Sequence, residues 1–321
     1  MIGALADIRG KVDFGIITIR EDEFEALFNR LPDPFATVDG ECIYNLHCLN
    51  LDGGGAYTIA TVRCAQQGNG EAQQVANAIL RDLAPRWLLV VGIAGGAPAM
   101  EFTLGDVIVA TQVADFNVGA VTTKGEHEYA LTGWVTHPEA QKHVAHLAAL
   151  GKRLGAWNSP ESIGAKRPGV KIVEENLCAD PEWNNKVKAT LEHHFNDSER
   201  HPKVTSGAIA CSDLVMKHAE LFQAWLKWFR QAKAVEMESA GIHHAAHAKG
   251  VPFLSIRGLS DIIGFRRDDT WATYACHRRR PSQSRSSKPS RSSRRARAQR
   301  IHRVPRRSPA RPLIQPRKAM A

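Results

Sequence analysis

The segment AVEMESAGIHHAAHAKGVPFLSIRGLSD, residues 234–261, decides the fold. It opens with an apolar run at Ala234–Met237, continues with a helix-compatible stretch at Ser239–Lys249, and closes with a second apolar run at Phe253–Leu259. Short apolar runs between turn signals predict buried strands. A helix between two such strands is the usual crossover connection of a parallel pair. The segment therefore predicts an α/β protein.

The same alternation of strands and helices recurs on the N-terminal side. Val12–Ile19 predicts a buried strand, and apolar residues at helical spacing predict an amphipathic helix from about Arg20. Further predicted strands are Tyr57–Val62, Trp87–Val91, Asp106–Val109 and Val204–Ala210, and further predicted helices lie near Glu71–Leu83 and Ala219–Gln231. We therefore expect one α/β domain over residues 12–276, with a central mixed, largely parallel twisted sheet flanked by helices.

Two regions depart from this pattern. Residues 122–203 are polar, carry predicted helices at His137–Leu154 and Pro181–His194, and are expected to be an insertion that decorates the domain. Residues 277–321 are rich in Arg, Ser and Pro and lack apolar periodicity, which predicts a disordered tail. This tail is either a basic arm for nucleic acid or an anionic surface, or out-of-frame sequence without an evolved role.

The net charge of +9 comes from this tail. It holds 16 of the 42 Lys and Arg residues and no Asp or Glu, so residues 1–276 carry 26 basic against 33 acidic residues, a net charge of −7. The domain has no electrostatic reason to bind phosphate backbones. Nucleic acid is therefore expected as a partner only through the tail.

The remaining composition excludes several classes of protein. No apolar run approaches the ~18 residues of a membrane helix, and Met1–Lys11 lacks the order of a signal peptide, so we expect a cytoplasmic protein without a membrane partner. The six cysteines form no C-x-x-C pair and are expected to be free thiols. His243, His244 and His247 show no H-E-x-x-H pattern and are interpreted as surface or packing residues. We expect no metal and no cofactor.

Acidic residues follow three of the predicted strands, where open α/β sheets bind their ligands. They lie in Arg20–Glu23, Val235–Ser239 and Ser260–Asp261. A fourth segment, Val91–Gly96, reads V-G-I-A-G-G and predicts a glycine turn after the strand Trp87–Val91, where a backbone can approach a ligand closely. Its spacing is not that of the G-x-G-x-x-G dinucleotide fingerprint.

Together and in this order, these segments resemble the nucleoside phosphorylase superfamily, most closely the methylthioadenosine/S-adenosylhomocysteine nucleosidases. The resemblance runs from about Val12 to Cys276 and is interrupted at residues 122–203. Its most specific marks are A-V-E-M-E at Ala234–Glu238 and V-P-F-x-x-x-R-x-x-S-D at Val251–Asp261. The resemblance implies a small-molecule nucleoside substrate and a homo-oligomer.

The resemblance also implies a role for each matching residue. The departing base gathers negative charge, which a general acid can quench. Asp261 matches the acid that protonates N7 of the purine, and Ser260 a serine that supports it. The other matches are Glu238 on the ribose hydroxyls, Met237 along the sugar, Glu23 as the group that orients and deprotonates the attacking water, and Arg257 near that water. Alternatively, Met237 belongs to the core and Arg257 simply pairs with an acid.

Two places depart from the family pattern. Ile93, beside Gly95 in the glycine segment, stands where the family has Ser or Thr, which removes a hydroxyl from the water or phosphate site. Val215 and Met216 stand where an aromatic residue would pack on the base, which puts adenine specificity in doubt. Cys211 is not expected to be a nucleophile, because no histidine nearby in sequence could act as its base.

Three functions remain open at this point. The first is hydrolysis of the N-glycosidic bond of a purine nucleoside or related nucleotide. The second is a phosphate-dependent nucleoside phosphorylase, for which Arg20 and Arg63 could supply cations, although Glu23 and Val91 disfavour phosphate at the places where phosphorylases carry arginines. The third is a non-catalytic nucleotide-binding regulatory module. The acidic segments favour hydrolysis.

Overall fold

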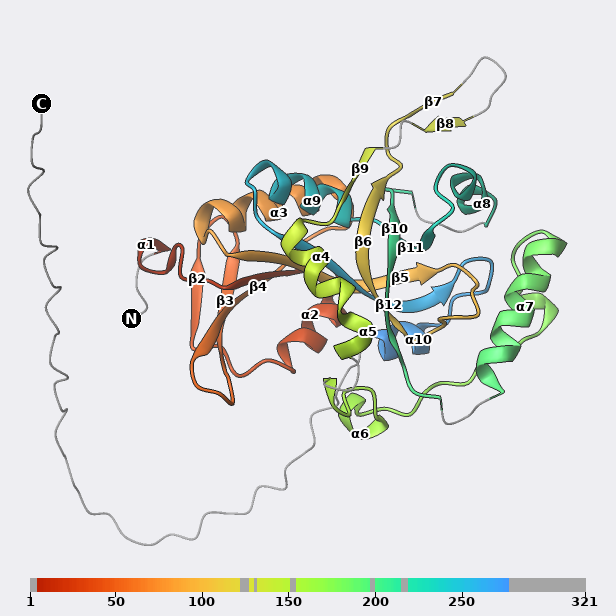
Figure 1. Cartoon of the computed structure of the whole chain (residues 1–321), viewed down its shortest axis with the longest axis horizontal. Helices are drawn as coiled ribbons and strands as arrows, with labels where there is room; N and C mark the ends of the chain where they lie inside the picture. Colours follow the sequence, from red (N-terminus) through yellow and green to blue (C-terminus); the bar gives the residue numbers. More distant parts are fainter. Residues whose placement is uncertain are drawn as a thin grey trace, which may run out of the picture. The chain divides into compact units, whose positions relative to one another are not determined.

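The structure is a computed structural model that describes residues 5–121, 127–129, 132–150, 154–196, 200–214 and 219–276. They belong to one compact unit with an α/β architecture, shown in Figure 1. The predicted tail, 277–321, and the predicted base contacts Val215 and Met216 lie outside the described residues. Within the described part of the chain, no helix combines the length and apolar character needed to cross a bilayer.

The elements alternate along the chain as the sequence predicts. The strands are β1 Phe14–Thr18, β2 Ala36–Asp39, β3 Ile43–Asn50, β4 Ala56–Arg63, β5 Trp87–Gly96, β6 Val107–Asp115, β7 Gly119–Val121, β8 His127–Tyr129, β9 Thr132–Val135, β10 Val204–Cys211, β11 Ala232–Glu236 and β12 Phe253–Ile262. The helices are α1 Leu5–Ile8, α2 Glu21–Phe28, α3 Asn69–Asp82, α4 Pro138–Ala145, α5 Leu147–Leu150, α6 Pro160–Ile163, α7 Pro181–Phe195, α8 Ala219–Trp228, α9 Ser239–Ala248 and α10 Asp269–Ala275, with a 3₁₀ turn at Glu174–Asn176.

Ten strands form one mixed sheet, which confirms the predicted fold class. Its order is β11-β10-β6-β12-β5-β1-β4-β3-β2, and β9 is added to β6. β1 is parallel to β4 and β5, and β5 is parallel to β12, as crossover helices require. β11 pairs with both β10 and β5, so the strands β5, β12, β6, β10 and β11 form a closed ring of paired strands. The carboxyl ends of β5, β11 and β12 consequently meet in one place.

The predicted glycine turn is wrong. The strand does not stop at Val91 but continues as β5 to Gly96, where it is hydrogen-bonded to β12 on one side and to β11 on the other. Glycines weaken an isolated strand. Here the two neighbouring strands supply hydrogen-bond partners for the extended backbone, so pairing overrides the local signal. Ser260 and Asp261 likewise lie within β12 rather than beyond it.

Part of the region predicted as an insertion is built into the sheet and the core. β9 pairs with β6 in antiparallel register, and α7 contributes buried Trp183, Val187 and Leu191 to a hydrophobic cluster shared with α8 and α10. In place of the single predicted helix His137–Leu154 there are two helices, α4 and α5, and His146 is the C-cap residue of α4. The β2–β3 hairpin was not predicted from the sequence, and its antiparallel strands extend the sheet at its edge.

Helices cover the sheet, and the buried apolar residues form two clusters. α3 and α9 lie side by side on the sheet, and their apolar residues form the larger cluster with β1 to β5 (Figure 1). Gly241 of α9 lies so close to α3 that a methyl group there would be 2.1 Å from the Asn69 carbonyl oxygen. The second cluster joins α7, α8 and α10. The polar ends of the central strands are left between the helices.

A buried ion pair fixes the end of the 122–203 region to β6. Arg200 donates two hydrogen bonds to Asp106, of 3.0 and 2.6 Å, and the two side chains are 8% and 0% exposed. The Thr103 and Lys203 backbone N–H groups also donate to Asp106. These donors come from two short stretches, one just before β6 and one just before β10.

We expect Arg200→Met to lower the free energy of unfolding by about 3–5 kcal/mol, because it leaves the Asp106 carboxylate buried without its cation. Urea denaturation followed by circular dichroism would measure the change. Lys142→Met is the matched control, since it breaks an exposed pair with Glu139 and should cost no more than about 1 kcal/mol. Equal effects of the two substitutions would contradict the assignment of Arg200 as a structural anchor.

Candidate active site

The strand register brings the three segments of the site together. Gly95 of β5 is paired with Asp261 of β12 on one side and with Val235 of β11 on the other. Glu238 follows the end of β11 by two residues and Asp261 belongs to β12, so the strands that flank Gly95 position both predicted carboxylates. A register irregularity between Leu259 and Asp261 accompanies this arrangement in β12.

A cavity of about 120 Å³, here called the inner cavity, lies at this point. It collects seven of the residues that the sequence singled out, from α2, β5, β12 and the segment between β11 and α9: Glu23, Ile93, Gly95, Met237, Glu238, Ser260 and Asp261. Ile19, Arg20, Gln67, Ala94, Leu214, Val235, Glu236 and Arg267 complete its lining. Arg257 is not among the lining residues, and Val215 and Met216 are outside the described residues.

The backbone holds Glu23 in place at the first turn of α2. One carboxylate oxygen accepts hydrogen bonds from the Ile19 and Arg20 N–H groups, of 3.0 and 2.9 Å, and the other accepts from the Ile93 N–H at 2.9 Å. The side chain is 5% exposed and reaches the inner cavity. Oε2 already accepts two hydrogen bonds, whereas Oε1 accepts one and has a further lone pair, so Glu23 can still accept a hydrogen bond from a small ligand through Oε1.

Two glycines of β5 make room for site residues. A methyl group on Gly92 would lie 2.6 Å from Nη1 of Arg257 and 2.7 Å from Oε1 of Glu23. On Gly95 it would lie 2.8 Å from Oδ2 of Asp261. The glycines therefore let functional side chains approach the strand, whereas the sequence analysis assigned them to a turn that approaches a ligand.

Glu236 is the functional residue that the sequence analysis missed. Its carboxylate binds the guanidinium of Arg257 and accepts the N–H groups of Glu238 and Ser239, at 3.1 and 3.0 Å. Arg257 is 0% exposed and also donates to the Ser239 and Ser255 hydroxyls. The signal in the sequence was the first acid of A-V-E-M-E, together with the interpretation of Arg257 as the partner of an acid.

Arg257 also lies beside the predicted ribose-binding carboxylate, with Nη2 3.6 Å from Oε2 of Glu238. Glu238 is 5% exposed, and this burial raises its pKa to about 7 from the ordinary 4.5. The Arg257 charge opposes the rise, whereas the nearby carboxylates of Glu236 and Glu23 add to it. One buried cation thus faces a group of carboxylates, which makes the charge on Glu238 costly.

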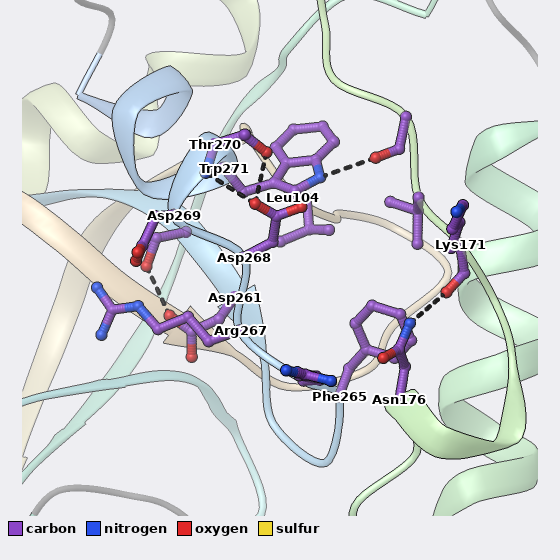
Figure 2. Close-up of a pocket in the computed structure, with 14 residues that line it drawn as sticks. Leu104, Lys171, Asn176, Asp261, Phe265, Arg267, Asp268, Asp269, Thr270 and Trp271 are labelled. Atoms are coloured by element: carbon purple, nitrogen blue, oxygen red, sulfur yellow. Dashed lines mark hydrogen bonds between the residues drawn. The ribbon is translucent and has the colours of Figure 1, made fainter.

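Asp261 occupies a different environment. It is only partly buried, and its Oδ1 accepts a hydrogen bond of 2.6 Å from the Ser260 hydroxyl. It lines the inner cavity and also a larger cavity of about 690 Å³, here called the outer cavity, which Figure 2 shows. Ser260 and Arg267 are shared by the two cavities as well. Asp261 therefore stands at the boundary between them.

The cysteines and histidines that the sequence singled out do not line the inner cavity. All six cysteines are free, as predicted, and burial raises the pKa of the Cys211 thiol, which makes it a poor nucleophile. His243 is 4% exposed on α9, against Phe253. Within the described residues, no cluster of three or more His, Cys, Asp or Glu side chains could hold a metal ion.

An α/β sheet with carboxylates around a cavity at its strand ends defines a small-molecule site rather than a macromolecular surface. The chain belongs to the phosphorylase superfamily, whose model matches residues 14–280.

Two relatives and one solved structure illustrate the similarity. The chain is 25% identical over 214 residues to ATP nucleosidase Cap17 of Escherichia coli, a match that covers 66% of this chain but only 37% of that protein. It is 25% identical over 250 residues to the 5'-methylthioadenosine/S-adenosylhomocysteine nucleosidase of Desulfotalea psychrophila, with 78% and 84% coverage. The nucleosidase of Colwellia psychrerythraea, solved in complex with adenine, has the same fold, with a TM-score of 0.54, 22% identity, and 84% and 90% coverage.

The raised pKa of Glu238 predicts a pH-dependent loss of stability. Between about pH 4.5 and 7 the folded protein binds a proton at Glu238 that the unfolded chain releases, so the contribution is full below pH 4.5 and is lost as the pH rises through 7.

Glu238→Gln cannot ionise and should remove this dependence. Relative to the wild type, the variant should therefore gain stability between pH 4.5 and 8, by at most about 3 kcal/mol. Urea titrations of both proteins at several pH values would measure the difference. A constant difference across this range would show that Glu238 titrates normally.

Proposed function

We propose that this protein hydrolyses the N-glycosidic bond of a purine nucleoside or related nucleotide and releases the free base. One observation carries the proposal: Glu238, Glu23 and Asp261 line a single cavity and have different environments. Glu238 and Glu23 are buried, while Asp261 is half-buried beside a hydroxyl group. Carboxyl groups in different environments can take different acid and base roles in one reaction.

The proposed reaction assigns one step to each group. The carboxylate of Glu238 accepts hydrogen bonds from the ribose hydroxyls and fixes the sugar, while Met237 packs along it. Asp261, in its acid form, donates a proton to N7 of the purine as the bond between C1′ and N9 breaks, and the bonding electrons leave with the base. The oxygen of a water molecule bonds to C1′, and Glu23 takes a proton from this water. Solvent then returns the proton from Glu23 to Asp261.

Arg257 is proposed as a positioning residue and not as a contact to the water. Its guanidinium binds Glu236 and lies next to Glu238, and it is fully buried behind the cavity lining. Glu236 in turn accepts the backbone N–H of Glu238. The pair therefore orients the ribose-binding carboxylate from two directions. Ser260 has the corresponding function for Asp261, through its hydrogen bond to Oδ1.

Neighbouring charges favour water over phosphate as the nucleophile. Arg20 donates hydrogen bonds of 2.8 and 2.7 Å to both carboxylate oxygens of Asp22. Arg63 lies 4.0 Å from Glu21. Arg20 and Arg63, the two cations that the sequence analysis considered for phosphate, already face carboxylates, and a phosphate dianion needs cations or donors that are free to bind it.

The related proteins agree with the coarse form of this proposal. Their names describe nucleosidases, one of them for ATP, and the Colwellia protein binds adenine. Free cysteines are in keeping with the reducing cytoplasm in which we expect the protein to act. We expect it to act as a homo-oligomer without a cofactor.

Substrates with different leaving groups separate the roles of Asp261 and Glu238. Asp261→Asn should abolish release of adenine from adenosine but retain most cleavage of 4-nitrophenyl riboside, whose leaving group needs no protonation. Glu238→Gln should lose at least about 2 kcal/mol of transition-state stabilisation with both substrates, because an amide accepts from only one oxygen. Steady-state kcat/KM values measure both effects. Equal losses by the Asn variant with the two substrates would remove Asp261 as the acid.

The sugar product distinguishes hydrolysis from phosphorolysis. In phosphate-free buffer, free ribose or its 5′-substituted analogue should appear at a rate that added phosphate does not increase. Chromatography of the products from a panel of nucleosides and nucleotides, with and without phosphate, provides the measurement. Strict dependence on phosphate, with ribose 1-phosphate as the product, would establish the phosphorylase alternative. Binding without any release of base would instead establish a regulatory module.

A further inference from the structure

The outer cavity adjoins the proposed site and has no role in the proposed reaction. Its volume is about 690 Å³, within the range of pockets that hold a complete small ligand. Besides β12, three parts of the chain line it: Leu104 before β6, the stretch 169–176 from the region predicted as an insertion, and the stretch 265–271, which runs from the turn after β12 into the start of α10. It shares Ser260, Asp261 and Arg267 with the inner cavity.

The position of Asp261 sets the direction from one cavity to the other. Of these two cavities, only the inner one is lined by Glu23, Met237 and Glu238, which we assign to the sugar and the water. Asp261, which we assign to N7 of the base, lines both. The N7 atom and the C6 substituent lie on the same edge of a purine. A base whose N7 contacts Asp261 therefore directs its C6 substituent past this residue, toward the outer cavity.

Apolar side chains face each other across this cavity. Figure 2 shows Leu104 and Trp271 on one side of the open space and Phe265 on the other, with Asp261 and Arg267 near its edge. Val170 adds to the apolar lining. An unsubstituted amino group at C6 would leave most of this surface uncovered, whereas an apolar or aromatic group would bury it.

Hydrogen bonds join the segment that carries Phe265 to residues 176–177. Phe265 pairs with Leu177 in an isolated β-bridge, its N–H donates to the Ile262 carbonyl at 2.9 Å, and the Arg266 N–H donates to the Asn176 carbonyl at 2.8 Å. The aromatic ring is therefore presented from a fixed backbone. A fixed aromatic surface gives contact area at low entropic cost.

We propose that the outer cavity is a subsite for an apolar or aromatic substituent on the C6 side of the purine, and that Phe265 is its specificity-determining residue. The inference rests on the proposed nucleosidase function and adds the class of substrate, namely C6-substituted purine nucleosides. The region predicted as a decorating insertion then has a second function, because its stretch 169–176 forms one wall of the subsite.

The test compares adenosine with N6-benzyladenosine. The wild type should cleave the benzyl compound with a kcat/KM at least equal to that for adenosine. Phe265→Ala should lower the ratio of the two kcat/KM values about tenfold, mainly through the KM of the benzyl compound, because the ring loses its aromatic contact. Val170→Trp should lower the same ratio by filling the cavity from the stretch 169–176, and it keeps the proposal testable if Phe265→Ala does not fold.

Control variants separate specificity from stability. Phe265→Tyr keeps the aromatic ring and should restore the ratio, while Phe35→Ala removes an exposed ring on the protein surface and should leave it unchanged. Rejection of N6-benzyladenosine by a wild type that cleaves adenosine would overturn the subsite, as would unchanged ratios in folded Phe265→Ala and Val170→Trp variants. If the wild type released no base from either compound or from the wider panel, the proposed function itself would fail.

Discussion

The ion pair between Arg257 and Glu236 is the interaction on which the rest of the site depends. It is fully buried and joins β12 to the end of β11, the two strands that flank Gly95 of β5. Separating two buried charges is costly, because each is left without compensation. The pair therefore holds the end of β11 against β12 more firmly than sheet hydrogen bonds alone would. Gly92 is required beside it, since any side chain there would collide with the guanidinium.

This constraint explains why the carboxylates of the site differ. Arg257 gives most of its hydrogen-bonding capacity to Glu236 and to the hydroxyls of Ser239 and Ser255. Glu238 lies at 3.6 Å from it and keeps a raised pKa, because the cation only partly offsets its burial. A hydrogen-bonding ligand that replaced the lost hydration of Glu238 would favour its charged form. The inner cavity is thus organised to bind a polar group such as a sugar diol more tightly when Glu238 is ionised.

Much of the architecture could be predicted from the sequence, because strands buried on both faces and amphipathic helices leave strong periodic signals. Val12–Ile19 and the helix after Arg20 are examples, realised as β1 and α2. The predictions failed where partners distant in sequence determine the structure. Gly92 to Gly96 are extended only because β11 and β12 pair with them. Glu236 acquired its function from Arg257, twenty-one residues later, and neither residue alone indicated this. The outer cavity combines three separate segments, so no local pattern could reveal it.

The two sides of the site are built from different kinds of structure, and this bears on how such a fold diversifies. The inner cavity is formed by paired strands, backbone hydrogen bonds to Glu23 and a buried ion pair, all of which tolerate little change. The outer cavity is lined mainly by a turn and by a stretch of the region 122–203, in which surface loops can vary without disturbing the core. Asp261 belongs to both, because β12 holds its backbone while its side chain faces the boundary. The proposed chemistry at C1′ can therefore stay constant while the surroundings of the proposed base change, and we expect substrate preference in this chain to follow the loops rather than the strands.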